Sequence, residues 1–450
     1  MKNINKLSLS LIAIGLMGSF YATAQNSVLS VSPVLETRSH FADAQGNFTD
    51  VDDPAIWIHP TNKAKSIVVT TLKKGGLDVY DLAGKLIQFV PPAPAPACAD
   101  TQAECDNKGG RFNNADIIYD FKLNGKNTDI VVVSDRGLDK LAIYSIVSDA
   151  KGTRLVDVTA ANGPLIFATN QDEINEGLTA YGLAAVKTDK SMAFVSQNST
   201  TAIEQLELFD DGKGKVNYRS MTRMNFPSLF TLPNGKVWTP CADDDGEAPH
   251  FEGMVADTAH GFLYLAQEDV GIWKADLKNP ANSQEWQLVA KVKKYGVPYS
   301  RTWDAGEEEY ICKLDFAKDP GYGSDKLLAD AEGLTIYDGG NGKGYLLASS
   351  QGNNTVAVYD RDGDNQFVNS FTVADGEIDG VNETDGMMVV NVNLGGRFDQ
   401  GMLVMQDGQN KGPKPSADDA RENSNFKYVA WRDIASKLNL PVDTKDMTRK

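Results

Sequence analysis

The sequence is short of histidine, cysteine and positive charge. Only 4 of its 450 residues are His and 4 are Cys, while 44 Lys and Arg face 61 Asp and Glu, for a net charge of −17. So acidic a chain lacks the basic surface that meets nucleic-acid phosphates, so no nucleic-acid partner is expected. A His-rich zinc site would use nearly every His. With 41% hydrophobic and 23% charged residues, the composition is that of a folded protein.

The first 24 residues have the features of a secretory signal peptide. Lys2 and Lys6 precede an apolar stretch at 7–20, and the small residues at 22–24 predict cleavage after Ala24. The stretch is short for a membrane span of about 20 residues, and an uncleaved anchor is the alternative. No later segment is predicted to span a membrane. We therefore expect a secreted or periplasmic protein with no membrane partner.

Export places the four cysteines in an oxidising compartment, where they are expected to pair. Four cysteines allow three pairings. We favour Cys98 with Cys105, which closes a small loop, and hence Cys241 with Cys312. The second pair joins two stretches that have the character of insertions.

Residues 25–450 repeat one pattern six times. Each unit has a strand opened by a polar residue, a strand with a polar end, and an alternating run that ends in Asp, Gly or Lys. The third element is anchored at Tyr80, Tyr144, Phe209, Trp273, Tyr359 and Met405. Short strands separated by Gly, Asp and Asn turns indicate antiparallel sheet. The repeat predicts an all-β, single-domain, six-bladed β-propeller, with a repeated β-sandwich as the alternative. A short C-terminal helix is expected at 431–438, followed by a loose tail at 441–450.

The polar ends of the strands should meet on one face. In an antiparallel pair, the start of the first strand and the end of the second lie at the same edge. The residues expected there are Asp52, Asp53, Asp116, Glu252, Glu268, Asp330, Glu332, Gln351, Asp379 and Asp385, with Lys73, Lys74 and Arg136. So many carboxylates cannot all ionise together without cations. Oxygen ligands select a hard cation, most simply Ca²⁺, and the flanking Lys and Arg suit phosphate.

Several long stretches resemble the β-propeller phytases, also called alkaline 3-phytases. They include "DDPAIWIHP", "LKKGGLDVYDL", "NNADIIYDFKLNG", "DAEGLTIYDGGNGKGYLLASSQGNN" and "NSNFKYVAWRDIA", and the resemblance extends from Glu36 to Leu438. It implies a six-bladed propeller that hydrolyses phytate (myo-inositol hexakisphosphate) with several Ca²⁺ ions at its active face. Free phytate or its calcium salt would be the substrate, and we expect the enzyme to act as a monomer.

The resemblance also assigns roles. Its calcium ligands fall on Asp52, Asp53, Glu252, Glu268, Asp330, Glu332, Asp379 and Asp385, with Glu36 as a further acid near the start and Gln351 added from its place at a strand end. Its phosphate-facing residues fall on Lys73, Lys74, Arg136 and Tyr181. In the implied mechanism, calcium binds phosphate oxygens and helps to ionise a water. Lys73, Lys74 and Arg136 stabilise the transferring group, and Glu252 and Glu268 anchor metal or orient the water.

The sequence departs from the family pattern in places. Ala180 stands where an acid usually precedes "YG", Asn198 is nearest to the position of a phosphate-holding lysine, and Gln267 replaces one acid of a pair. Residues 91–105 and 221–250 have the character of insertions. Two alternatives therefore stay open: a non-catalytic propeller that binds calcium or inositol phosphates, and a lactonase-like calcium hydrolase.

Overall fold

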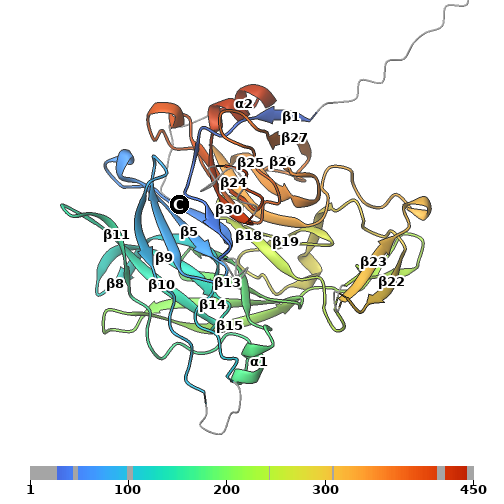
Figure 1. The fold of residues 1–450 in the computed structure, drawn as a ribbon, viewed down its shortest axis with the longest axis horizontal. Helices are drawn as coiled ribbons and strands as arrows, with labels where there is room; N and C mark the ends of the chain where they lie inside the picture. Colours follow the sequence, from blue (N-terminus) through green and yellow to red (C-terminus); the bar gives the residue numbers. More distant parts are fainter. Residues whose placement is uncertain are drawn as a thin grey trace, which may run out of the picture.

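The computed structural model describes residues 28–43, 49–98, 105–242, 244–306, 309–412 and 421–442. The predicted signal peptide and the tail beyond residue 442 lie outside these ranges. Within them, six sheets of at least four strands stand around a common axis (Figure 1). The innermost strands contact one another in a closed circle, the last lying against the first. The predicted six-bladed β-propeller is confirmed.

The first three blades follow chain order from the inside outwards. The first has β4 (Val51–Trp57), β5 (Ile67–Leu72), β6 (Leu77–Asp81) and β7 (Leu86–Val90). The second has β8 (Phe112–Leu123), β9 (Lys126–Asp135), β10 (Lys140–Asp149) and β11 (Gly152–Asp157). The third has β12 (Ala180–Lys187), β13 (Ser191–Gln197), β14 (Ala202–Asp210) and β15 (Val216–Asn225), with helix α1 (Gln171–Asn175) before it.

The fourth and fifth blades keep this order. The fourth has β18 (Phe251–Asp257), β19 (Phe262–Gln267), β20 (Gly271–Asp276) and β21 (Gln287–Lys291). The fifth has β24 (Ala331–Gly340), β25 (Lys343–Ser350), β26 (Thr355–Asp360) and β27 (Phe367–Val373). Outside β27, the early strand β1 (Leu29–Val31) pairs with it in parallel.

The sixth blade is shared by the two ends of the chain. It has β28 (Met387–Val390), β29 (Met402–Asp407) and β30 (Asn423–Ala430), and the N-terminal strand β2 (Leu35–Glu36) pairs with β30 as its outermost strand. The short β3 (His40–Phe41) also pairs with β30. The two ends thereby close the ring.

The sixth repeat differs from the sequence prediction. Five of the six anchors lie in the third strand of their blade, but Met405 lies in β29, the second strand of the last blade. An Asp-Gly turn follows β29 and imitates the end of a third strand. The true third strand, β30, is buried along its whole length and shows no alternation of polar and apolar residues.

Apolar faces of neighbouring blades form the core. Val69 of the first blade, for example, belongs to one buried cluster with Ile117 and Val133 of the second. Helix α2 (Trp431–Leu438), which confirms the predicted C-terminal helix, covers β1, β27 and β30. Its Trp431 is fully buried and stacks on Tyr337 with ring centroids 4.0 Å apart. No helix in the described part of the chain is long and apolar enough to cross a membrane.

Two small sheets lie outside the blades. They are β16 (Phe230–Thr231) with β17 (Val237–Trp238), and the hairpin β22 (Tyr299–Asp304) with β23 (Glu309–Leu314), which stands away from the ring (Figure 1). A disulfide joins Cys241, just after β17, to Cys312 in β23, and Cys98 pairs with Cys105. Both favoured disulfides are confirmed.

Candidate functional site

Five of the six innermost strands carry a bulge at their start. In β4, β8, β12, β18 and β24 the pairing register shifts just after the first residue, so two residues oppose one. We call the first residue of each bulge, together with Asp385 two residues before β28, the axial ring. It consists of Asp52, Asn113, Tyr181, Glu252, Glu332 and Asp385.

Glycine lets the members of the axial ring approach one another. The residue after Tyr181 is Gly182, where a Cβ would lie 2.1 Å from the Glu252 carbonyl oxygen. Gly253 stands in the same relation to Glu332, also at 2.1 Å. Any side chain would push each blade off the next, so these positions require glycine. Hydroxyls on the second strands complete the joint, since Ser134 Oγ donates to the Tyr181 carbonyl at 2.5 Å.

Glu252 is held from two sides within the ring. Asn113 Nδ2 donates to its Oε1 at 2.7 Å, and the Tyr181 hydroxyl donates to its Oε2 at 3.0 Å. Burial disfavours the charge of Glu252, but Lys73 and hydrogen bonds, that from Tyr181 among them, outweigh burial and lower its pKa. Glu252 is therefore the carboxylate of the ring that keeps its charge most easily.

Other acids of the ring are buried without compensation. Both carboxylate oxygens of Asp52 and Oε2 of Glu332 have no hydrogen-bond partner among the described residues. Burial, followed by repulsion from neighbouring carboxylates, raises the pKa of both groups well above its ordinary value. One ligand atom each from Glu252, Glu268 and Glu332 lie within 4.8 Å of one another. A site of this kind holds either protons or a cation.

Glu268 and Asp330 lie beside the ring, at a cavity of about 340 Å³ that the inserted hairpin helps to wall. His250 Nε2 is 3.0 Å from Glu268 Oε1, and the two carboxylates Glu268 and Glu247 outweigh burial and raise the pKa of His250 to about 9. Burial and the repulsion of Asp269 and Glu268 raise the pKa of Asp330 to about 7. Lys294 Nζ lies 3.8 Å from Asp330 Oδ1.

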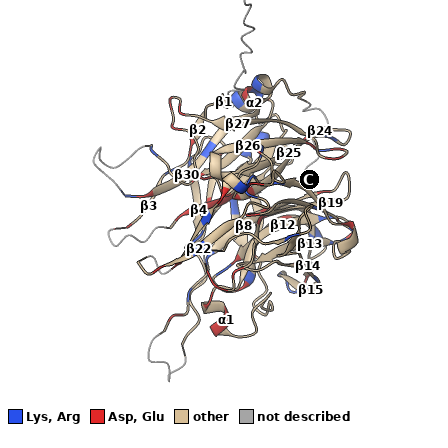
Figure 2. Ribbon diagram, turned by 90° about the vertical axis from the view of Figure 1, so that its right-hand side faces the viewer, with Lys and Arg blue, Asp and Glu red and all other residues tan. Residues whose placement is uncertain are grey.

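Lysine and arginine residues also lie at this face, and Figure 2 shows blue ribbon beside β4. Lys73 Nζ contacts Asp385 Oδ2 at 2.5 Å, and Gln351 Nε2 donates to Asp385 Oδ1 at 2.7 Å. Burial raises the pKa of Asp385 to about 6 although Lys73 lies against it. Arg136 lies over the Tyr181 ring, 5.1 Å from its centroid, whereas Lys74 is exposed.

Glu36 and Asp379 lie apart from the axial ring, in the last blade. They surround Lys427, whose side chain is fully buried. The Lys427 ammonium contacts Asp379 Oδ1 at 2.6 Å, Glu36 Oε2 at 2.7 Å and Asn410 Oδ1 at 2.7 Å. Asp407 Oδ2 is 3.4 Å away. We call Lys427 and these four partners the Lys427 cluster; its three carboxylates share one lysine ammonium.

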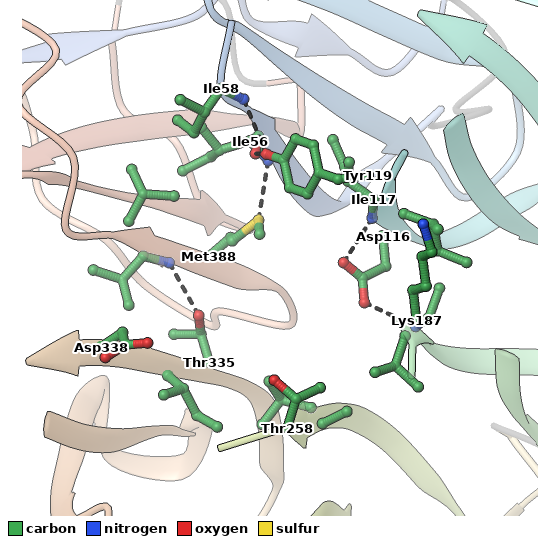
Figure 3. A pocket seen from close by; sticks show the side chains of 18 of the residues that line it. Ile56, Ile58, Asp116, Ile117, Tyr119, Lys187, Thr258, Thr335, Asp338 and Met388 are labelled. Atoms are coloured by element: carbon green, nitrogen blue, oxygen red, sulfur yellow. Dashed lines mark hydrogen bonds between the residues drawn. The ribbon is translucent and has the colours of Figure 1, made fainter. Parts of the chain in front are cut away.

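Two further acids that the sequence predicts at this face, Asp53 and Asp116, lie away from the ring. Asp53 turns to the second blade, where its Oδ2 accepts a hydrogen bond from the Ala115 amide at 3.1 Å. Asp116, expected at the mouth, instead lines a cavity of about 370 Å³ farther along the inner strands (Figure 3). The backbone amides of Ile117 and Ala185 donate to it. Because of the bulge, Asn113 occupies the place in the ring that the sequence pattern predicts for Asp116.

Three residues at this face are not predicted as site residues from the sequence: Asn113, His250 and Arg111. Asn113 could have been found by aligning the bulge pairs, because "NN" in β8 stands under "DD" in β4. His250 and Arg111 follow insertions, where no repeat position marks them.

A six-bladed propeller with a ring of buried carboxylates and flanking Lys and Arg offers the acidic and positive side chains that enzymes of phosphate chemistry use. The comparisons make this specific. The family model "Phytase" matches residues 3–231 and 317–449. A 3-phytase from Bacillus subtilis (strain 168) is 35% identical over 392 residues, which cover 86% of this chain and 81% of the relative. This chain belongs to the phytase family.

A solved structure titled "Crystal structure of BBS1N in complex with ARL6DN, soaked with lead" is also similar. The match covers 83% of this chain and 77% of that chain, with a TM-score of 0.37 and 9% sequence identity. A likeness of this size bears on neither the site nor the function.

Proposed function

We propose that this chain is a calcium-dependent phosphomonoester hydrolase that removes phosphate from phytate. Membership in the phytase family makes it a phytate-hydrolysing phosphatase and sets aside the non-catalytic and lactonase-like alternatives. One observation carries the calcium dependence: buried carboxylate oxygens of Asp52 and Glu332 face the ring without a hydrogen-bond donor among the described residues. Ionised carboxylates so buried require a compensating cation.

The residues of the ring fit a hard cation. The available ligands are carboxylate and amide oxygens, with no thiolate among them, which is the donor set of Ca²⁺. The ligands that we propose are Asp52, Glu252, Glu268, Asp330, Glu332, Gln351 and Asp385; Asp53, which turns to the second blade and accepts the Ala115 amide, is left out. Calcium could use Glu36 and Asp379 only by displacing the Lys427 ammonium, so we leave these two outside the proposed metal set.

The chain's own side chains would then act on the phosphate. Bound calcium supplies positive charge for phosphate oxygens and lowers the pKa of a water molecule. Lys73 and Arg136 stabilise the negative charge that develops on the transferring group, and Lys74 adds a more exposed positive charge. Tyr181, fixed by Glu252, supports Arg136 through its ring. Glu268 accepts the proton of the attacking water as the bond from phosphorus to the inositol oxygen breaks.

The setting of the enzyme is also part of the proposal. We place it outside the cytoplasm, as a secreted or periplasmic monomer, and two disulfides support an oxidising compartment. Calcium phytate fits this acidic protein better than the free hexaphosphate, because metal then lies between two anionic partners.

Phosphate release from phytate, measured while calcium is added and then chelated, tests the proposal. We expect release to vanish on chelation and return with calcium. Unchanged release in chelator would refute the metal requirement, and no release at any calcium concentration would refute the activity. Glu268→Gln is expected to lose turnover and to retain phytate binding, which separates a catalytic role from one in binding alone.

A further inference from the structure

Two arginines face each other where β8 begins and β9 ends. Phe112 pairs with Asp135, so the next residues outwards, Arg111 and Arg136, are opposite each other. The Arg136 amide donates to the Arg111 carbonyl at 2.8 Å. Gly137 permits this approach, because a Cβ there would lie 2.0 Å from the Gly109 carbonyl oxygen and 3.1 Å from Arg111 Cγ. The fold therefore holds two like charges together.

Neither guanidinium has a carboxylate within 4.0 Å in the described part of the chain. Arg111 Nε donates to the Lys73 carbonyl at 3.4 Å, and Arg136 Nη1 donates to Asn113 Oδ1 at 3.2 Å. The nearest acid, Asp135, is occupied: its Oδ1 accepts the amides of Arg111, Gly137 and Leu138 at 2.9, 3.0 and 3.2 Å. Burial and the charge of Arg136 lower the pKa of Arg111.

This arrangement costs stability. Like charges directly opposite each other on paired strands repel, and a protein with a net charge of −17 has acids to spare for neutralising them. Lys73 shows the contrast, since its ammonium contacts the Asp385 carboxylate at 2.5 Å. An uncompensated arginine pair beside an active face is a binding site for an anion, and planar guanidinium groups match phosphate oxygens.

We propose that Arg111 is a further substrate-binding residue: beside Arg136, which faces the transferring phosphate, Arg111 holds a neighbouring phosphate group of the substrate that is not the one being hydrolysed, and the two arginines form a clamp. This rests on the proposed function, in which the substrate carries several phosphates. Arg111 donates a hydrogen bond to the Lys73 carbonyl and lies outside the axial ring. The reacting phosphate would lie at the ring. The clamp also answers a departure from the family: Asn198, near the position of the expected lysine, supplies no charge and donates to the Gly177 carbonyl at 3.2 Å.

The test uses Arg111→Gln in the full chain with calcium present. The probe is myo-inositol hexakissulfate, which carries six anionic esters that a phosphatase does not hydrolyse. We expect its Kd, measured by titration calorimetry, to rise roughly 10- to 100-fold, the loss of a charged hydrogen bond or two. The KM for phytate should rise similarly, with a smaller change in kcat. Arg111→Lys should give Kd and KM values between those of wild type and Arg111→Gln, because it keeps the positive charge and loses the planar guanidinium group.

Arg154→Gln is the matched control, since Arg154 is paired with Asp149 on the surface, and it should leave Kd and KM unchanged. An unchanged Kd in Arg111→Gln would overturn the clamp, as would a loss confined to kcat. If Arg111→Gln fails to fold, the same readings on Arg111→Lys decide. Wild type that binds the hexakissulfate but releases no phosphate would refute the proposed function and leave the clamp standing.

Discussion

The axial ring and the Lys427 cluster are both groups of acids inside the propeller, but only the Lys427 cluster has a lysine ammonium at its centre. In the Lys427 cluster, one ammonium lies within 2.7 Å of an oxygen of Glu36, Asp379 and Asn410. In the ring, oxygens of Asp52 and Glu332 have no partner in the described part of the chain. Lys73 lies beside the ring and contacts Asp385, another of its members.

This difference separates a structural role from a functional one. A buried charge that the chain itself compensates needs no ligand and fixes the fold around it. A buried charge left uncompensated is tolerated only where a ligand or protons complete it. Both groups draw on the same excess of Asp and Glu, so composition alone cannot distinguish them. What distinguishes them is the place of one lysine.

The largest effect is expected from Lys427→Met, which removes the internal cation and nearly keeps the volume. It leaves Glu36, Asp379 and Asp407 buried together, and breaking a buried pair in this way costs about 3–5 kcal/mol. The free energy of unfolding, measured with urea, should fall by that amount. Added calcium should restore part of the loss, because the emptied cluster would then resemble the ring.

The exposed Lys343, paired with Asp362, provides the control. Lys343→Met should leave the free energy of unfolding close to that of wild type, because exposed ion pairs contribute little. If Lys427→Met were equally harmless, Lys427 would not be the cation that the cluster depends on.

The next effect is on activity. Lys73→Met removes the ammonium that contacts Asp385 of the ring and should lower kcat for phytate roughly 100- to 1,000-fold, as the loss of a group that stabilises the transferring phosphate does. Lys74→Met, at the exposed neighbour, should lower kcat by less than about tenfold because solvent screens its charge. Equal losses in the two variants would show that burial beside the ring gives Lys73 no special role.

Much of this comparison is visible in the sequence, and part of it is not. The six repeats predict the propeller, and the polar openings of the inner strands predict most of the ring, because strand ends must share a face. The bulges are not visible, since one extra residue in a register changes no composition, and so Asp116 was placed where Asn113 lies. The role of Lys427 is hidden too, because nothing in the strand sequence "NSNFKYVA" indicates that its lysine is fully buried among acids from other segments.

Glu332→Gln should act in opposite directions with and without calcium. The pKa of Glu332 is raised above its ordinary 4.5, so its carboxyl favours folding below about pH 4.5 and opposes it as pH rises. Without metal at pH 7, the variant should therefore be more stable than wild type. With calcium, it should lose part of the metal-dependent gain in Tm and most of its phosphate release.

Thermal melts at pH 5 and pH 7 test whether Glu332→Gln stabilises the metal-free protein. The advantage of the metal-free variant should shrink toward zero as the pH falls to about 4.5, where the wild-type carboxyl is protonated. A variant less stable than wild type at every pH would mean that Glu332 is satisfied in the folded protein, as the acids of the Lys427 cluster are.

The smallest effect is expected from Asp379→Asn, and it decides whether the two groups of acids really differ. Asn keeps an oxygen for Lys427, and Glu36 remains against the ammonium, so the free energy of unfolding should fall by only about 1 kcal/mol. The calcium concentration that gives half-maximal phosphate release should not move, whereas Glu332→Gln should raise it. A shift of more than about threefold in Asp379→Asn would mean that calcium displaces Lys427 and binds there. The Lys427 cluster would then be a second metal site that the lysine occupies only until calcium arrives.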